Sequence, residues 1–530
     1  MEQVKDGNEH ARAQIRATGL VSSMTLASRL LGLVREQVFA SLLGAGYYTD
    51  AFNVAFRIPN LLRDLFAEGA LSAAFVPTYA RVLQQGGREE AQRLARRLFT
   101  LLAVLMSGLV VLGMVFAGPL SAALAPGYAA VKGKAELTAL LTRVMMPFLP
   151  LVSFAAVAMG MLNAEERFGF PAFAPAMFNV VSVLWGLGLW AAGFSPATVA
   201  IGWSVGTLLG GAAQFLIQVV PLRKMGFSYR PEWAPGDPVL RRVFVLMAPA
   251  TVGLAAVQIN IFVNSYFASF EEGAVSWLSY AFRILYLPIG IFGVATGTVA
   301  TTSLARSAAL QDMDGVRATL RRSLLFLAFL TLPATVGLGV LGRPVVRLLY
   351  ERGRFGAEAT EGTAAALVFY AIGLVAYTSV KVLAPAFYAL GTPRVPLLAS
   401  GLAVFTNLAV NLGLHGPYGF RAVALGTSLG AIANAALLLF VLERRVGGLV
   451  TRDALGRLAR MVVASFAMGL LLVPFGAWLT ALFGTRGLTA QALTGLLPVG
   501  VGAAVYLALA RLLGIQEAAS LIDLARRRGR

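Results

Sequence analysis

Ala55-Phe56-Arg57-Ile58 and Ala281-Phe282-Arg283-Ile284 are the same four residues, about 225 positions apart. Further matches follow in nearly the same register: Ala80-Arg81 with Ala305-Arg306, Arg96-Arg97 with Arg321-Arg322, Pro119 with Pro344, and Gly127 with Gly353. A register held over this distance is hard to attribute to chance in a Leu/Ala-rich chain, so the sequence predicts two similar halves. Each half places an arginine inside an apolar stretch, which indicates that the halves face each other across something anionic.

Composition indicates that the chain lies in a lipid membrane. Of its 530 residues, 58% are hydrophobic and 13% are charged, with a mean hydropathy of +0.75, which fits no soluble domain of this length. Runs of about 20 apolar residues, enough to cross roughly 30 Å of hydrocarbon, recur along the sequence. Because these runs lack the alternation of barrel strands, we predict an all-α polytopic membrane protein.

The apolar runs predict about 14 transmembrane helices. They lie near residues 18–44, 50–80, 96–122, 136–162, 171–195, 198–221, 242–269, 275–304, 321–342, 361–390, 394–414, 420–442, 458–483 and 490–513. Six helices per half is an even number, so we expect two parallel six-helix repeats, a transporter design with the substrate site between the repeats. The expected divisions are an N-terminal lobe at 1–222, a cytoplasmic linker at 223–241, a C-terminal lobe at 242–445, and two extra helices with a basic tail at 446–530.

The net charge of +19 is chiefly a signal of topology. Lysine and arginine collect at the N-terminus, in the connections after even-numbered spans, and at the C-terminus, so both termini are expected in the cytoplasm. Residues 1–17 are polar and charged and do not resemble a cleavable signal peptide. The basic residues at 526–530 are expected to contact anionic membrane lipids, and the charge distribution does not favour nucleic-acid binding. Cysteine is absent, which excludes disulfides and thiolate chemistry.

Basic residues within the spans are the candidates for ligand contact. They are Arg29, Arg35, Arg57, Arg63, Arg143, Arg283, Lys381 and Arg511. A charge at the bilayer centre costs roughly 2.5–3.5 kcal/mol unless it faces water or a partner, although Arg143 and Arg511, near span ends, can snorkel. Arg57 shares a helix face with Asp50, Asp64 and Glu68, which leaves an internal ion-pair ladder as an alternative. Arg29, Arg63 and Arg283 have few acidic neighbours, and their planar guanidinium groups suit a diphosphate.

Several motifs carry a family resemblance. Ser22-Ser-Met-Thr-Leu-Ala-Ser-Arg29-Leu-Leu-Gly32-Leu-Val-Arg35-Glu36, Gly44-Ala-Gly-Tyr-Tyr-Thr-Asp50, and Arg57-Ile-Pro59-Asn60-Leu-Leu-Arg63-Asp64-Leu-Phe-Ala-Glu68 resemble the start of the MurJ/MviN family of bacterial lipid II flippases. Ser276-Trp277 with Arg283, Val380-Lys381 with Pro385 and Tyr388, and Gly391-Thr-Pro393 are similar to later family motifs. The resemblance covers essentially the whole chain.

The resemblance implies the fold of the multidrug/oligosaccharidyl-lipid/polysaccharide exporters, with two six-helix lobes around a central cavity. It implies lipid II, an undecaprenyl diphosphate bearing a disaccharide-pentapeptide, as substrate, and the bacterial cytoplasmic membrane as location. The family's cavity residues correspond to Arg29, Arg35, Arg63 and Arg283 with Asp50, Asn60 and Glu68, while Arg57 and Lys381 are further substrate-binding candidates. Many relatives carry an aspartate where this chain has Phe282. The diphosphate is expected to bind the arginines while rocking of the lobes gives alternating access.

The residues suggest two driving forces. No phosphate-binding loop is present, so ATP is not expected to drive transport, and membrane potential is the first candidate, since it can act on an arginine-rich cavity. Sodium is the second candidate, at Asn260, Asn264, Asn407, Asn411 and Thr427, although neutral groups there favour interhelical hydrogen bonding. The sequence has no cluster of His, Cys and carboxylate residues of the kind that an enzyme site would need. The alternatives are a flippase for another polyprenyl-diphosphate-linked oligosaccharide, a drug exporter of the same fold, and a membrane scaffold for wall-synthesis proteins.

Overall fold

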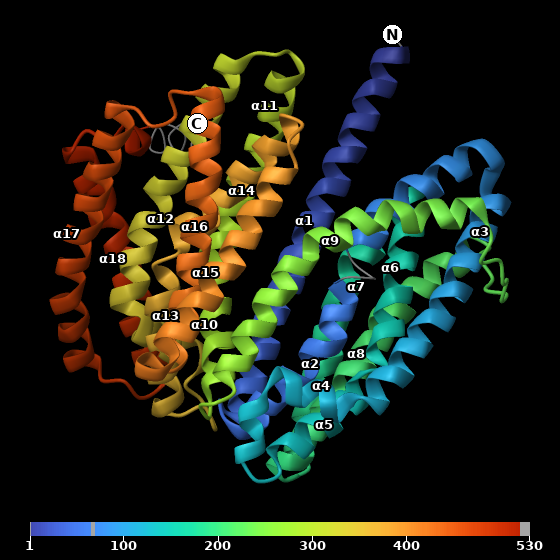
Figure 1. Cartoon of the computed structure of the whole chain (residues 1–530), viewed down its shortest axis with the longest axis horizontal. Coiled ribbons are helices and arrows are strands. Elements are labelled where there is room, and N and C mark those ends of the chain that lie inside the picture. Colours follow the sequence, from blue (N-terminus) through green and yellow to red (C-terminus); the bar gives the residue numbers. More distant parts are fainter. Residues whose placement is uncertain (1, 65–68, 520–530) are drawn as a thin grey trace. The chain divides into compact units, whose positions relative to one another are not determined.

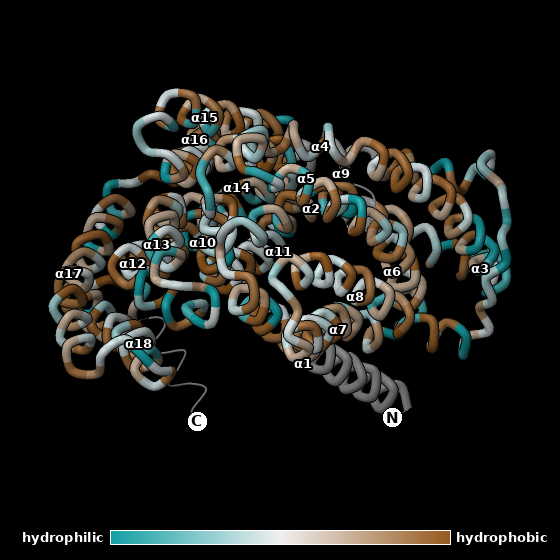
Figure 2. The backbone as a smooth tube through the Cα atoms, turned by 90° about the horizontal axis from the view of Figure 1, so that it is seen from below, coloured by the Kyte–Doolittle hydropathy of each residue, from teal (hydrophilic) through white to brown (hydrophobic). Residues whose placement is uncertain are grey.

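A computed structural model describes residues 2–64 and 69–519, and these residues form helices and no β-strand (Figure 1). Among them, ten helices are long and apolar enough to cross a membrane singly, and the bent pair α13 and α14 (Ala357–Ala371 and Leu374–Ala389) makes up to eleven. Most helices consist largely of hydrophobic residues, and hydrophilic residues gather mainly in the connections (Figure 2). The all-α polytopic membrane fold is therefore confirmed, while the number of fourteen spans stays a prediction.

Two compact units divide the chain. The N-terminal unit comprises Met1–Gln258 and Arg352–Phe355, and the C-terminal unit comprises Ile259–Glu351 and Gly356–Arg530. The division falls inside α9 (Pro238–Ala268), so that one helix contributes residues to both units. The segment Arg352–Phe355 belongs to the N-terminal unit although its chain neighbours do not. Its Arg354 N–H donates to the carbonyl of Ser41 at 2.9 Å.

Helices of the N-terminal unit follow one another with short connections. They are α1 (Glu2–Leu43), α2 (Tyr47–Arg63), α3 (Gly69–Val115), α4 (Ala117–Leu124), the 3₁₀ turn η2 (Pro126–Ala130), α5 (Lys134–Met145), α6 (Phe148–Ala164), α7 (Gly169–Ala191) and α8 (Pro196–Lys224). One core cluster is built from α1, α2, α5 and α8, where the ring of Phe39 lies 4.8 Å from that of Phe52 and 5.0 Å from that of Trp203. These buried rings pack the four helices together.

Helices of the C-terminal unit include both additions after the repeat. Besides α13 and α14 they are α10 (Ala274–Pro288), the π-helical segment η3 (Ile289–Val294), α11 (Ala295–Ala309), α12 (Met313–Tyr350), α15 (Arg394–Tyr418), α16 (Phe420–Val446), α17 (Arg452–Phe483) and α18 (Leu488–Leu512). The last two pack on α12 around Phe329, Met468 and Tyr506, with the Phe329 and Tyr506 rings 5.3 Å apart. The extra helices thus share a core with the repeat that precedes them.

Several long helical stretches are bent or interrupted, one in a predicted connection and two in predicted spans. The backbone of Gly87 is non-helical (φ 78°, ψ −179°) and bends α3, a conformation that essentially only glycine adopts. The segment η3 separates α10 from α11 inside the predicted span 275–304, and α13 and α14 meet at a 47° bend. Such breaks are frequent at functional sites and hinges of membrane proteins.

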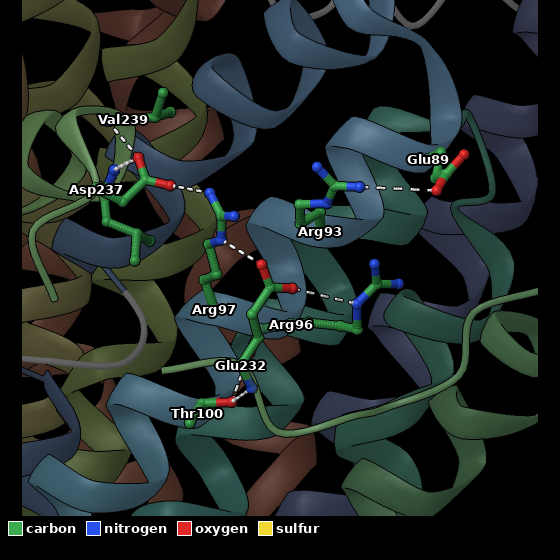
Figure 3. A network of polar contacts seen from close by, with 9 residues as sticks. Glu89, Arg93, Arg96, Arg97, Thr100, Glu232, Asp237 and Val239 are labelled. Carbon is green, nitrogen blue, oxygen red and sulfur yellow. Dashed lines mark hydrogen bonds and ion pairs between the residues drawn. The ribbon is translucent and has the colours of Figure 1, made fainter. Parts of the chain in front are cut away.

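The polar connection between α8 and α9 is fastened to α3 (Figure 3). Arg97 donates from Nε to Glu232 at 2.7 Å and from Nη1 to Asp237 at 2.5 Å. The Glu232 N–H donates to Thr100 at 3.0 Å, and Arg96 Nε lies 3.7 Å from the same glutamate. The predicted linker 223–241 therefore reduces to residues 225–237, held within the N-terminal unit by charged hydrogen bonds.

Candidate functional site

The two arginines predicted on the first span lie on α1 in different settings. Arg29 is exposed, and among the described residues it forms no ion pair. Arg35 is partly buried, donates to Glu36 at 2.5 Å, and places its guanidinium carbon 5.0 Å from the centre of the Phe178 ring on α7. Asn179 of α7 donates to the Ser28 carbonyl at 3.2 Å. Helix α7 therefore orients this part of α1, and Arg29 is available to a ligand.

A second cationic group lies on α2. Arg63 donates to the adjacent Asp64 at 2.9 Å, and Gln258 of α9 donates to the other oxygen of that carboxylate at 3.3 Å. Arg63 is near enough to Arg35 for their charges to repel. Arg57 and Asn60 are partly buried on the same helix. Glu68, a further predicted contact, lies outside the described residues.

Asp50 has a different environment from the one expected of a substrate contact. Its side chain has no exposed surface, and it accepts a hydrogen bond at 2.9 Å from Lys134, whose side chain is only 1% exposed. The Lys134 ammonium also lies 4.3 Å from the centre of the Tyr128 ring. This geometry ties the first turns of α2 and α5 together. The side chain is enclosed by protein, and it cannot contact a substrate in this arrangement.

In the C-terminal unit, Arg283 is partly buried on α10. Tyr350 at the end of α12 is within electrostatic reach of the guanidinium. Phe282 packs its ring 5.4 Å from that of Tyr370 and 6.2 Å from that of Tyr377. The residue before Arg283 thus belongs to an aromatic cluster. Lys381, the remaining basic candidate of this unit, lies on α14 in an exposed position.

The five neutral residues considered for sodium meet in one hydrogen-bonded cluster. Asn407 donates to Asn264 at 2.8 Å and also to Asn260, and Asn264 donates to Thr427 at 3.0 Å. Asn411 donates to the Asn407 side chain at 2.9 Å. The described part of the chain holds no group of three His, Cys, Asp or Glu residues that could bind a metal. Most oxygens of this cluster already accept N–H groups.

Each unit carries guanidinium groups on helices that the sequence assigns to the membrane. They belong to α1 and α2 in the N-terminal unit and to α10 in the C-terminal unit. The nearby carboxylates of Glu36 and Asp64 are each hydrogen-bonded to an arginine. Charged groups at membrane depth usually mark substrate pathways. Sequence reasoning did not find Lys134 or Gln258 as partners, because both lie far along the chain from the carboxylates they bind.

Known proteins resemble the chain along nearly its full length. The family model described as "Lipid II flippase MurJ" matches residues 39–493. A probable lipid II flippase MurJ of Vibrio cholerae is 36% identical over 94% of this chain and 95% of the relative. A lipid II flippase MurJ of Burkholderia cenocepacia is 36% identical over 81% of this chain and 84% of the relative.

Solved structures agree with the sequence relatives. A lipid II flippase MurJ in an inward closed conformation matches with a TM-score of 0.76 at 25% identity, over 93% of this chain and 98% of the other. An inward-facing multidrug transporter of the MATE family matches with a TM-score of 0.66 at 17% identity, over 81% and 98% of the two chains, and shares the fold. The extent and identity of these matches show that the chain belongs to the MurJ family of lipid II flippases, as its first two helices had indicated.

Proposed function

We propose that this protein carries lipid II from the inner to the outer leaflet of the bacterial cytoplasmic membrane. The observation that carries the proposal is the set of guanidinium groups in membrane helices, Arg29, Arg63 and Arg283, in a chain of this family. A diphosphate offers two or more negative charges and several acceptor oxygens, which match the donors of several arginines. A cationic drug would be repelled by the same groups. These charges therefore favour a transporter of an anionic headgroup over an exporter of cationic drugs.

The transport cycle is proposed to be alternating access. The diphosphate binds the arginines while the sugars and the peptide occupy polar surroundings and the C55 tail remains in lipid. Gly87, the π-helical segment Ile289–Val294 and the bend between α13 and α14 are places where long helices can change direction. Membrane potential, worth about 2.3 kcal/mol per charge per 100 mV, can return an arginine-rich site to the inner side.

The decisive experiment uses a bacterium depleted of its own flippase and expressing this chain. A toxin that cleaves only outward-facing lipid II is added, and its product is counted. We expect product with the unchanged chain and a loss of at least about tenfold with Arg29→Ala or Arg283→Ala, since each removes a charged contact. Arg343→Ala is the matched control, because Arg343 forms an exposed pair with Glu361.

The outcomes separate the alternatives. Product from the control and from both arginine variants would contradict diphosphate binding by these residues. No product from the normally inserted, unchanged chain would direct the search to another polyprenyl-diphosphate-linked oligosaccharide. Complementation of growth by variants that make no product would indicate a scaffold role with wall-synthesis proteins.

A further inference from the structure

An open, shallow recess lies on the C-terminal unit, and its lining includes hydroxyl and ammonium groups. Its volume is about 420 Å³, and it is lined by Val294, Gly297, Thr298, Thr301, Thr302 and Lys381. The three threonines are exposed on one face of α11, and Lys381 is exposed on α14. Within the described part of the chain Lys381 forms no ion pair. The recess thus presents one ammonium group beside three hydroxyl groups.

Two glycines fix the position of the lysine. A side chain added at Gly297 would place its Cβ 2.6 Å from the Lys381 carbonyl oxygen, and one added at Gly293 would come within 3.0 Å of Thr378. The backbones of α11 and α14 therefore touch at Lys381, with no side chain between them. Lys381 is exposed and lines the recess beside this contact.

Each of the three threonine hydroxyls donates its hydrogen bond to a backbone carbonyl of the preceding turn. Thr298 donates to the Val294 carbonyl at 2.9 Å, Thr301 to Gly297 at 2.7 Å, and Thr302 to Thr298 at 3.3 Å. A hydroxyl has one proton and two lone pairs, so each oxygen still offers acceptor capacity to the recess. The site therefore combines one positive charge with three acceptors.

The positions of the lining residues in the sequence indicate that the recess faces water rather than lipid. Thr298, Thr301 and Thr302 lie in the predicted span 275–304, and Lys381 lies in the predicted span 361–390. A lysine and three hydroxyls on one surface at membrane depth are expected to face a water-filled pathway. The recess also begins at Val294, the last residue of the π-helical segment, and such segments are frequent at functional sites.

We propose that this recess is a subsite for the peptide part of the transported headgroup. Lys381 binds a carboxylate of the peptide, and the threonine oxygens accept adjacent peptide N–H groups. A diphosphate does not fit this pattern, because it presents acceptors only and would meet the lone pairs of three hydroxyls. The assignment rests on the proposed function and extends it. The arginines bind the diphosphate, and this recess of the C-terminal unit binds the peptide.

The test compares two forms of lipid II, one with free peptide carboxylates and one in which they are amidated. Their dissociation constants are measured on the purified full-length protein in detergent. We expect the unchanged chain to bind the carboxylate form about tenfold more tightly, as for a charge-assisted hydrogen bond. Lys381→Gln should remove this preference by weakening the carboxylate form and leave the binding of the amidated form unchanged. A variant with valine at positions 298, 301 and 302 should weaken both forms, because both keep peptide N–H groups.

Lys224→Gln is the matched control, because it removes the same charge from the exposed end of α8, and it should keep the preference. Equal binding of both forms by the unchanged chain would overturn the subsite while leaving the proposed function intact. An equal loss for both forms in Lys381→Gln would also overturn it, since it would mean that the lysine contacts the diphosphate or only supports the fold. Failure of the unchanged chain to bind either form would overturn the proposed function and the subsite with it.

Discussion

Lys134 occupies an unfavourable position for a cation, the first turn of a helix, where the backbone dipole is positive. Its almost complete burial is tolerated because Asp50 accepts a hydrogen bond from its ammonium group at 2.9 Å and the centre of the Tyr128 ring lies 4.3 Å from it. Asp50 itself lies in the first turn of α2, where a negative charge is favoured. The aspartate thus stabilises both helix ends.

Removing the lysine should destabilise the protein strongly. Breaking a buried ion pair by deleting one partner costs about 3–5 kcal/mol, so Lys134→Met should clearly lower the midpoint of thermal unfolding in detergent. Arg343→Ala, in an exposed pair, should change it little. The double variant Asp50→Asn/Lys134→Met should recover part of the loss, because no buried carboxylate then lacks its ammonium partner. An unfolding midpoint for Lys134→Met equal to that of Arg343→Ala would contradict this structural role.

Sequence reasoning recognises charged residues of this kind more readily than their partners. The family resemblance pointed to Asp50, and helical spacing offered Arg57 as its partner, but spacing along one helix cannot reveal a lysine on another helix. The same limit applies to Asp64, which accepts a hydrogen bond from Gln258 of α9. For Phe282, the sequence showed only that an acid is missing. The structure shows that rings of Tyr370 and Tyr377 surround the phenyl group.

At the scale of elements, apolar runs predicted helices well and their breaks poorly. Within the described residues the predicted spans fall largely on helix, but the spans 96–122, 136–162, 275–304 and 361–390 are each divided into consecutive segments. Hydropathy averages over about 20 residues, so it cannot register a break of one or two. The polar connection predicted after residue 80 is helical apart from Gly87, since its Leu, Gln, Arg and Glu residues favour helix.

Composition predicts a linker at 223–241, and it cannot show that the non-helical part, 225–237, is docked. Its attachment depends on Asp237, which caps α9 by accepting the N–H groups of Val239 at 2.7 Å and Leu240 at 3.3 Å. Partial burial alone would raise the pKa of Asp237, but the hydrogen bond from Arg97 and those two N–H groups outweigh it and hold the pKa below its ordinary value. The ionised carboxylate is therefore the docked form.

Docking should consequently be lost in acid. A carboxyl group whose pKa is lowered by folding contributes stability that is fully present above its unfolded pKa and disappears as the pH falls through the folded value. The segment should stay docked at neutral pH and loosen below about pH 4. Because the chain has no cysteine, Phe227→Cys, at a buried position beside Phe99, provides a single thiol whose labelling by a pyridyl disulfide reports release.

The control adds Asp237→Asn to this cysteine variant. Its labelling should be faster already at pH 7, and acidification should change it less. Any acid-dependent rise that remains would report Glu232, the other carboxylate bound to Arg97. An identical pH profile with and without Asp237→Asn would refute the role given to this aspartate.

At the scale of the whole molecule, the distribution of basic residues predicts that both termini face the cytoplasm. Two single-cysteine variants test this orientation. One has a cysteine added after Arg530 and is expected to react inside the cell, and the other is Lys132→Cys, in the connection before α5, which is expected to react outside. A membrane-impermeant maleimide applied to intact cells should label Lys132→Cys and leave the C-terminal cysteine unlabelled until the cells are opened. Labelling of the C-terminal cysteine in intact cells would reverse the topology.

The energy source is also a property of the whole molecule, and the asparagine cluster bears on it. Asn260, Asn264 and Asn407 are joined side chain to side chain. A sodium ion there would have to break these bonds, and no carboxylate of the cluster would balance its buried charge. Lipid II transport into the outer leaflet of reconstituted vesicles should therefore keep its rate within about twofold when potassium replaces sodium, and should respond instead to an imposed membrane potential. Asn411→Ala should leave the ion response unchanged. A rate that depends on sodium, and loses that dependence in Asn411→Ala, would place the coupling ion in this cluster.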